Sequence, residues 1–310
     1  MLFMNIFVYL KEIQNLIDEA LNDVYEVEIA LKENEQKKLN NNNEITKKFI
    51  LKSSMTNKGA EILIFDSRKQ LEDYFQRRVD QSEDETIDLT EWVIQEYIDK
   101  PLQLVSYNKR KFHLRVYVVA VGNLKVYVYN DILALFSLRS YDDCSQLDDN
   151  IDMKSHITNT CVQLDDVKCE NDSKFSKLES ECIKRFWELN FDENDENLNQ
   201  EKRDLIFRQI KDCVGEIFEC LSNEPTVFQP LENAFELYGF DFLIDQNYNC
   251  YFLEANAFPD FKQTGDNLND LISCLFYQTI SLSSDDYFKI PKVCEPNKMH
   301  IVYEKKSYKN

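Results

Sequence analysis

Residues 235–259 constrain this sequence most, because they combine two strand patterns with a short polar turn. Apolar side chains recur at every second position in two runs, which predicts two extended segments. These apolar positions are Phe240, Phe242, Ile244, Tyr251 and Leu253. Residues 245–249 supply the polar side chains that favour a tight turn. The stretch therefore predicts a β-hairpin.

Three oxygen-bearing side chains, Asp241, Glu254 and Asn256, lie on this hairpin. Glu254 and Asn256 are two residues apart and are expected to point to the same face, and Asp241 to lie near them at one end of the sheet. Carboxylate and amide oxygens suit Mg²⁺, with substrate phosphates completing the coordination. The alternative interpretation is an acidic hairpin that faces water.

Composition narrows the classes of partner. The chain has 310 residues, of which 43% are hydrophobic, so it can bury a substantial core in one large domain or two lobes. Its 36 basic and 56 acidic residues give a formal net charge of −20. Such a charge argues against direct nucleic-acid binding and against an anionic membrane surface, and favours a basic or neutral protein partner.

Cysteine usage indicates a reducing compartment. The nine cysteines form no C-x-x-C pair and no zinc-like cluster, which predicts free thiols and a cytoplasmic location. The first ten residues are apolar but too few for a membrane span, and no basic leader or cleavage site accompanies them. We expect them to begin a buried strand or helix, at the cut edge of a longer protein.

Strand and helix patterns are mixed without regular alternation, which predicts an α+β fold. Strands are expected at residues 49–52, 62–65, 92–98, 112–121 and 124–129, the last two joined by a Gly122-Asn123 turn. Helices are expected before residue 39 and at residues 67–79, 174–189, 204–221 and 268–280. The acidic segment 192–201 is expected to be a loop, and residues 281–310 a polar surface tail.

Two lysines indicate a phosphate-binding loop. Lys52 ends a predicted strand, and Lys58 precedes Gly59 in a short polar loop. Compact ammonium groups and backbone N–H donors could converge there on a polyphosphate. Ordinary surface lysines are the alternative interpretation.

Five motifs in one order resemble the tubulin-tyrosine-ligase-like family of ATP-grasp enzymes over residues 48–280. The motifs are Lys52-Ser-Ser-Met-Thr-Asn-Lys58-Gly59, Gln95-Glu-Tyr-Ile98, Lys111-Phe-His-Leu-Arg115, His156-Ile-Thr-Asn159, and Phe240-Asp241-Phe with Leu253-Glu254-Ala-Asn256. The resemblance implies an ATP-grasp fold with two lobes, at about 48–100 and 101–280, whose antiparallel sheets sandwich the nucleotide. Residues 1–47 would then be a reduced amino-terminal lobe or helical lead-in.

The same resemblance implies roles for individual residues in binding ATP. Lys52 and Lys58 would contact the phosphates, and Lys111 would lie over the nucleotide. The adenine would lie against an edge strand whose backbone offers hydrogen bonds. That strand comprises Gln95, Glu96, Tyr97 and Ile98.

For the reaction itself, the resemblance implies that Asp241, Glu254 and Asn256 hold Mg²⁺. Arg115 and Asn159 would act at the transferring phosphoryl group. The implied reaction activates a carboxylate as an acyl phosphate, which an amino group then attacks to give an amide.

Three features depart from the family pattern. His113 stands where the family has an aspartate that contacts the nucleotide, and a neutral imidazole could still bond a ribose hydroxyl. Ala134-Leu135 stand where family members carry an arginine that grips the acceptor carboxylate, and Arg139 is a candidate substitute. The charge of −20 also argues against glutamate-rich tubulin tails as substrate.

Two functions follow from these features. One is an ATP- and Mg-dependent ligase acting on a protein or peptide acceptor. The other is an interaction module with a degenerate acceptor site. The acidic, asparagine-rich sequence resembles a fungal family member associated with cytoplasmic mRNA-processing bodies, which implies a partner in mRNA decapping or another ribonucleoprotein assembly.

Overall fold

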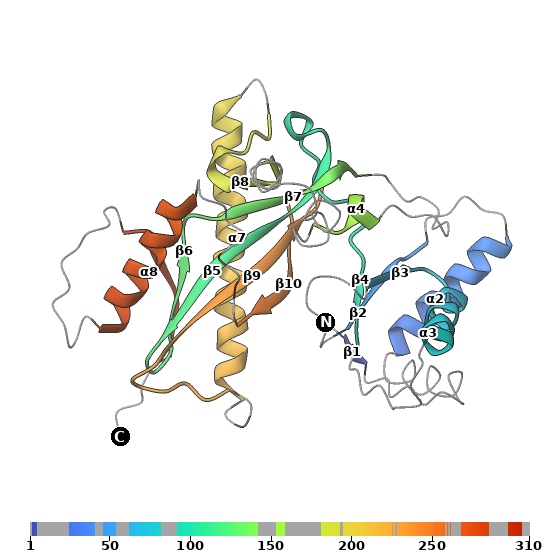
Figure 1. Cartoon of the computed structure of the whole chain (residues 1–310), viewed down its shortest axis with the longest axis horizontal. Helices are drawn as coiled ribbons and strands as arrows, with labels where there is room; N and C mark the ends of the chain where they lie inside the picture. Colours follow the sequence, from blue (N-terminus) through green and yellow to red (C-terminus); the bar gives the residue numbers. More distant parts are fainter. Residues whose placement is uncertain are drawn as a thin grey trace. The chain divides into compact units, whose positions relative to one another are not determined.

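The computed structural model describes residues 2–4, 25–40, 46–53, 62–81, 92–141, 153–158, 181–192, 195–224, 226, 228–257, 259, 261, 268–284 and 297–305. The chain divides into two compact units. The first unit contains Met1–Lys100 and Asp142–Met153, and the second contains Pro101–Tyr141 and Lys154–Asn310. Each unit is built on an antiparallel sheet with helices (Figure 1), which confirms the α+β prediction.

The first unit is a four-stranded sheet in the order β1-β4-β2-β3. Its strands are β1 (Leu2–Met4), β2 (Phe49–Ser53), β3 (Ile62–Phe65) and β4 (Trp92–Glu96). Helices α2 (Tyr25–Leu39) and α3 (Arg68–Gln81) pack on one side of β2, β3 and β4 (Figure 1). The contact is an apolar cluster that includes Leu31, Phe75, Leu51, Phe65 and Trp92. Lys52 alternates with Leu51 along β2 and therefore faces away from these helices.

The second unit is a seven-stranded sheet centred on β5 (Arg110–Val121). The other strands are β6 (Lys125–Tyr129), β7 (Leu133–Ser140), β8 (Ile183–Arg185), β9 (Phe235–Ile244), β10 (Cys250–Asn256) and β11 (Met299–Glu304). Helices α7 (Glu196–Ser222) and α8 (Asn269–Ser284) belong to it, and α7 crosses behind β5 and β9 in Figure 1. The shorter helices are η1 (Val105–Tyr107), α4 (Met153–His156) and η2 (Phe186–Glu188).

Alternation along β5 decides which side chains meet which helix. Leu114, Val116 and Val118 pack with α7 in one core cluster, whereas Tyr117 and Val119 pack with α8 on the opposite face. Period-2 geometry places Lys111, His113 and Arg115 on the same face as Tyr117. The face that carries α8 therefore becomes polar toward the beginning of β5.

Several elements differ from the sequence-based predictions. The hairpin at Gly122 is confirmed, with Gly122 at φ 56° in the loop between β5 and β6. In contrast, residues 183–188 of the predicted helix 174–189 form β8 and the 3₁₀ helix η2. Residues 299–304, predicted as part of a surface tail, pair with β6 as β11. Each of these strands depends on a partner far away in the sequence, which periodicity does not reveal.

Helix α7 begins eight residues earlier than expected, at Glu196 rather than Asp204. Asp195 caps it, because its carboxylate accepts hydrogen bonds from the backbone N–H groups of Asn197 (2.9 Å) and Leu198 (3.1 Å). The segment predicted as an acidic loop is thus partly the first turns of the helix. The capping aspartate was the signal available in the sequence.

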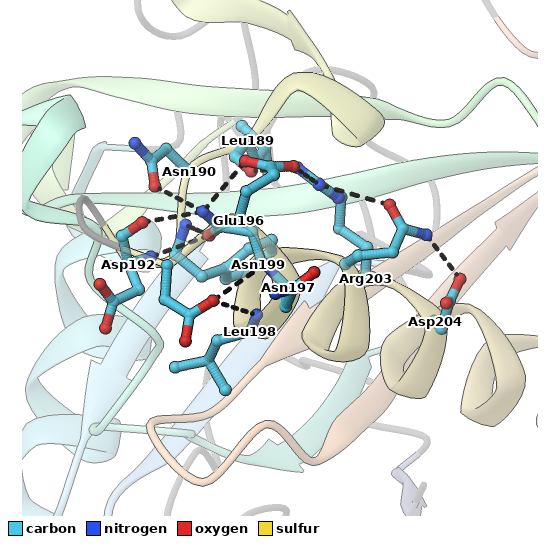
Figure 2. A network of polar contacts seen from close by, with 12 residues as sticks. Leu189, Asn190, Asp192, Glu196, Asn197, Leu198, Asn199, Arg203 and Asp204 are labelled. Carbon is cyan, nitrogen blue, oxygen red and sulfur yellow. Dashed lines mark hydrogen bonds and ion pairs between the residues drawn. The ribbon is translucent and has the colours of Figure 1, made fainter.

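Buried Asn199 ties the first turn of α7 to the segment before it (Figure 2). Its side-chain oxygen accepts from the backbone N–H groups of Phe191 (2.6 Å) and Asp192 (2.9 Å), and its nitrogen donates to the carbonyl of Asp192 (2.8 Å). Arg203 completes the network by donating to the carbonyl of Leu189 (3.1 Å) and to the carboxylate of Glu196. These contacts satisfy backbone groups of residues 189–192, in the segment before the helix.

Replacing buried Asn199 by alanine is expected to destabilise the protein by about 2–4 kcal/mol, because two partly buried backbone N–H groups lose their acceptor. Thermal and urea unfolding measure the loss. The matched control is Asn197→Ala on the exposed side of the same turn, with an expected change within about 0.5 kcal/mol. Equal effects of the two substitutions would contradict the assigned role of Asn199.

Candidate functional site

The predicted hairpin is present as β9 and β10, and Asp245 builds its turn. The Asp245 carboxylate accepts from the backbone N–H groups of Asn247 (2.8 Å) and Asn249 (2.9 Å) and from the Asn249 side chain (2.9 Å). Tyr248 takes a positive φ of 65° within the turn. Burial pushes the pKa of Asp245 upward, but these hydrogen bonds outweigh burial, and the pKa of Asp245 is lowered.

A β-bulge in β10 aims Glu254 at the site. Phe252 pairs with Phe242 and packs toward the α7 core, and the register then shifts so that Glu254 pairs with Asp241. In a regular strand Glu254 would share the face of Phe252, since the two are two residues apart. The bulge reverses this and brings Glu254 to the face of Asp241. The extended segment predicted from Tyr251 and Leu253 is present as β10, and Phe252 is the residue that packs on the core.

Asn256 joins the same face through its register with Gly239, which is two residues from Asp241. Its side-chain nitrogen donates to Glu254 Oε1 at 3.3 Å. The sequence predicted that Glu254 and Asn256 share a face, and the register confirms it. The structure thus brings Asp241, Glu254 and Asn256 onto one face at the end of two neighbouring strands.

Arg115 on β5 lies directly opposite Asp241 and binds both of its carboxylate oxygens. Its Nε donates to Oδ1 at 2.5 Å, and its Nη2 donates to Oδ2 at 3.1 Å. Asp241 is buried and Arg115 is largely so. Burial alone would lower the pKa of Arg115, but attraction to Asp241 prevails and the pKa is raised. The guanidinium is therefore permanently charged where it meets Asp241.

Gly239 makes room for this ion pair. A Cβ at position 239 would lie 3.1 Å from Cδ of Arg115 and 3.0 Å from Cβ of Pro259. Any larger residue would push the arginine side chain out of place. Sequence reasoning did not single out Gly239, although it directly precedes the Phe240-Asp241-Phe242 motif.

His113 extends the polar face beyond Arg115. Its Nδ1 lies 2.6 Å from Oγ1 of Thr158, and its Nε2 lies 3.9 Å from Oδ1 of Asp241. His113 and Thr158 are both buried. The contact attaches residue 158 of the His156-Ile-Thr-Asn159 motif to the central strand, and Thr158 was not among the predicted site residues. Asn159, from the same motif, lies outside the described residues.

This group of side chains fits a hard cation in its chemistry. Asp241, Glu254 and Asn256 offer three oxygen ligands, and Glu254 is exposed, as suits a magnesium ion that also binds substrate phosphates. Within the described ranges, no group of three or more His, Cys, Asp or Glu residues is placed to hold a metal. Two carboxylates and one amide would leave part of the coordination of such an ion to other ligands.

The first unit carries its predicted nucleotide residues on its own sheet. Lys52 pairs with Val93, and Ile50 with Gln95, so Lys52 and Gln95 share the face opposite α2 and α3. Lys58 lies outside the described residues.

The pairing of β4 with β1 ends at Ile94, whereas its pairing with β2 continues to Glu96. The prediction that the backbone of residues 95–98 offers hydrogen bonds at a strand edge therefore stays a prediction. The backbone N–H of Tyr97 already donates to the carbonyl of Lys48 at 2.8 Å. Glu96 forms an ion pair with Lys47 at 2.8 Å, Tyr97 is buried, and Ile98 is half-buried. The N–H of Tyr97 is thus not the donor that a purine would use.

The two departures from the family pattern are cross-strand neighbours. His113 pairs with Leu135, and Arg115 pairs with Leu133, in the β5–β7 register. Leu133 and Leu135 are both buried and belong to the apolar cluster under α8. Ala134 lies on the opposite face, in the α7 core. Arg139, the candidate substitute, is exposed near the end of β7.

No helix among the described segments is long and apolar enough to cross a membrane.

Solved structures identify the class of protein. The crystal structure of the C-terminal domain of K. lactis Pby1, described as an ATP-grasp enzyme interacting with the mRNA decapping enzyme Dcp2, is similar over 98% of this chain and 72% of that chain. The identity is 31% and the TM-score is 0.64. This similarity shows that the chain, with its two antiparallel sheets, has an ATP-grasp fold.

Sequence comparison gives the family. The model of the tubulin-tyrosine ligase family matches residues 4–297, and the chain belongs to that family. A probable tubulin–tyrosine ligase of Schizosaccharomyces pombe is 33% identical over 294 residues, covering 88% of this chain and 66% of the relative. The probable tubulin–tyrosine ligase PBY1 of Saccharomyces cerevisiae is 35% identical over 292 residues, covering 85% of this chain and 36% of the relative. The chain thus spans less than two thirds of either relative.

Asp245 gives the hairpin a pH-dependent stability. Its lowered folded-state pKa means that the ionised carboxylate stabilises the protein above the unfolded pKa of about 3.9, and that this stabilisation is lost as the pH falls through the lower folded value. Asp245→Asn is expected to lower the free energy of unfolding by about 1–3 kcal/mol near pH 7. Below about pH 4, the variant is expected to lose less stability than the wild type as the pH falls. Thermal unfolding across the acid range measures both effects.

The control for this prediction is Asp212→Asn on the exposed side of α7, where the change is expected to stay within about 0.5 kcal/mol at pH 7. A stability curve of Asp245→Asn that runs parallel to the wild-type curve at every acidic pH would contradict the prediction.

Proposed function

We propose that this chain binds ATP with Mg²⁺ and joins a carboxylate to an amine through an acyl phosphate. The observation that carries the proposal is the common face of Asp241, Glu254 and Asn256, with Arg115 fixed against Asp241. Family membership supports the use of ATP. When bound, Mg²⁺ would neutralise negative charge on the phosphates.

The residues of each unit have separate proposed roles. On the second unit, Asp241, Glu254 and Asn256 hold the metal, and Lys111 and His113 contact the nucleotide. On the first unit, Lys52 and Gln95 present an ammonium group and an amide on one sheet face. Ile98 supplies apolar contact, and Glu96 and Tyr97 belong to the same adenine-binding segment. Lys58 and Asn159 complete the set as proposals from the motifs alone.

The proposed reaction needs no protein nucleophile. A carboxylate oxygen of one substrate attacks the terminal phosphorus of ATP, the bond to the bridging oxygen breaks, and ADP leaves. The amine of the second substrate then attacks the acyl carbon, phosphate leaves with the C–O bonding pair, and the amine gives up a proton to form the amide. The chain's contribution is to orient the substrates and stabilise charge.

A second candidate function is a protein-interaction module that retains the fold. His113 stands where the family has an aspartate, and Ala134-Leu135 stand where it has an acceptor-gripping arginine. Leu135 lies opposite His113 and is buried, and it offers no charge to an acidic acceptor. The net charge of −20 favours a basic or neutral partner over a tubulin tail. Because the similar K. lactis domain is described as interacting with Dcp2, the mRNA decapping enzyme is the proposed partner, and a cytoplasmic processing body the proposed location.

Thermal unfolding with and without Mg·ATP tests the nucleotide proposal. A ligand at about 100 times its dissociation constant is expected to add about 2.7 kcal/mol of stability. Asp241→Ala is expected to abolish the part of this shift that depends on Mg²⁺. Glu304→Ala, which removes an exposed carboxylate on β11, is the matched control and should keep the shift.

The absence of any shift with millimolar Mg·ATP would refute nucleotide binding. A shift that survives Asp241→Ala would refute the metal assignment alone. Trapping the acyl phosphate with hydroxylamine, or ADP release that requires an added peptide or amino acid, then separates the ligase from the interaction module. Nucleotide binding without either signal across a peptide panel would favour the interaction module.

A further inference from the structure

We propose that Arg115 is a positioning residue that blocks binding of free divalent cations at Asp241, so that the metal enters only together with nucleotide phosphates. This inference rests on the proposed function, because it concerns the same metal site. It differs from the role expected for Arg115 at the transferring phosphoryl group. In the absence of nucleotide, the partner of the guanidinium is Asp241.

The geometry shows how completely Arg115 engages this carboxylate. Both carboxylate oxygens are bound, at 2.5 Å and 3.1 Å, by two nitrogens of one planar group. Cross-strand pairing holds the two backbones opposite each other, and Gly239 leaves the space in which the arginine side chain lies. The arrangement is thus imposed by two strands and a glycine, and it is not a chance surface contact.

Charge explains why such a pair excludes a free cation. An arginine carries its positive charge at any physiological pH, and here it compensates the charge of Asp241 at contact distance. A free divalent cation would have to approach this guanidinium in a largely buried location, where repulsion is weakly screened. Of the three predicted metal ligands, exposed Glu254 and neutral Asn256 then remain to attract the cation, and an exposed charge attracts weakly in water.

Nucleotide phosphates change this balance. They bring negative charge that attracts the guanidinium and ligand oxygens that complete the metal's coordination. Asp241 can then exchange the guanidinium of Arg115 for the metal ion. Its buried carboxylate is never left without a positive partner, a state that would be costly. The ion pair therefore holds the Asp241 carboxylate in a fixed orientation before the metal arrives.

Electron paramagnetic resonance of Mn²⁺, titrated into the protein without nucleotide, tests this proposal and does not depend on catalysis. Arg115→Met keeps most of the side-chain volume and removes the charge, and it is expected to bind free Mn²⁺ at least about tenfold more tightly than the wild type. Arg115→Lys retains the charge and is expected to show no such gain. Adding Asp241→Asn to Arg115→Met is expected to remove the gain.

The matched control is Lys125→Met, which removes one positive charge from an exposed position on the same sheet. If its gain equals that of Arg115→Met, or if Arg115→Met binds Mn²⁺ no better than the wild type, the proposal is overturned. Arg115→Gln removes the charge but keeps a hydrogen-bond donor, and it serves as the second variant if thermal unfolding shows that Arg115→Met does not fold.

The outcomes also separate this inference from the proposed function. Wild-type stabilisation by Mg·ATP without any Mn²⁺ gain in Arg115→Met or Arg115→Gln would refute the inference and leave nucleotide binding intact. A Mn²⁺ gain in a protein that Mg·ATP does not stabilise would support the charge block and refute the proposed function.

Discussion

Strand β5 is the constraint on which the second unit depends, because it is paired on both sides over most of its length. One edge pairs with β9 from His113 to Val121. The other edge pairs with β7 as far as Arg115 and with β6 from Val118 onward. Near this change of partner, the side chains of β5 on the face that carries α8 change from polar, at His113 and Arg115, to apolar, at Tyr117 and Val119. His113 and Arg115 thus lie on the part of β5 that pairs with β7.

The sequence predicted the hairpin well because its signals are local. Alternation along residues 240–244 and the polar turn at Asp245 act over a few residues, and the structure contains both. The common face of Glu254 and Asn256 follows from the same local rule. Lys52 and Gln95 share a face that the sequence motifs alone did not specify, because their pairing across β2 and β4 joins segments far apart in the chain.

Long-range pairing explains what the sequence could not predict. Nothing within residues 299–304 reveals that β6 is their partner, and the polar residues around them favour a surface tail. Residues 183–185 have a helical pattern but pair with β7, so tertiary contact overrides the local preference. The partnership of Arg115 and Asp241, separated by 126 positions, likewise required the sheet register. The departures at His113 and at Ala134-Leu135 are separate in the sequence, but the register places His113 opposite Leu135.

The bulge in β10 has a consequence for how the hairpin can vary in length. In the regular part of β9–β10, partners such as Ile244 and Cys250 or Phe242 and Phe252 are separated by an even number of residues, whereas Asp241 and Glu254 are separated by an odd number, 254 − 241 = 13. Because the separations nearer the turn are even, this odd separation requires a register shift, and it lies between Phe252 and Glu254. Removing or adding one residue in this interval would therefore turn Glu254 toward the apolar core unless the bulge changed with it. A hairpin that gains or loses one residue can therefore keep Asp241 and Glu254 on one face only if the bulge between Phe252 and Glu254 changes as well.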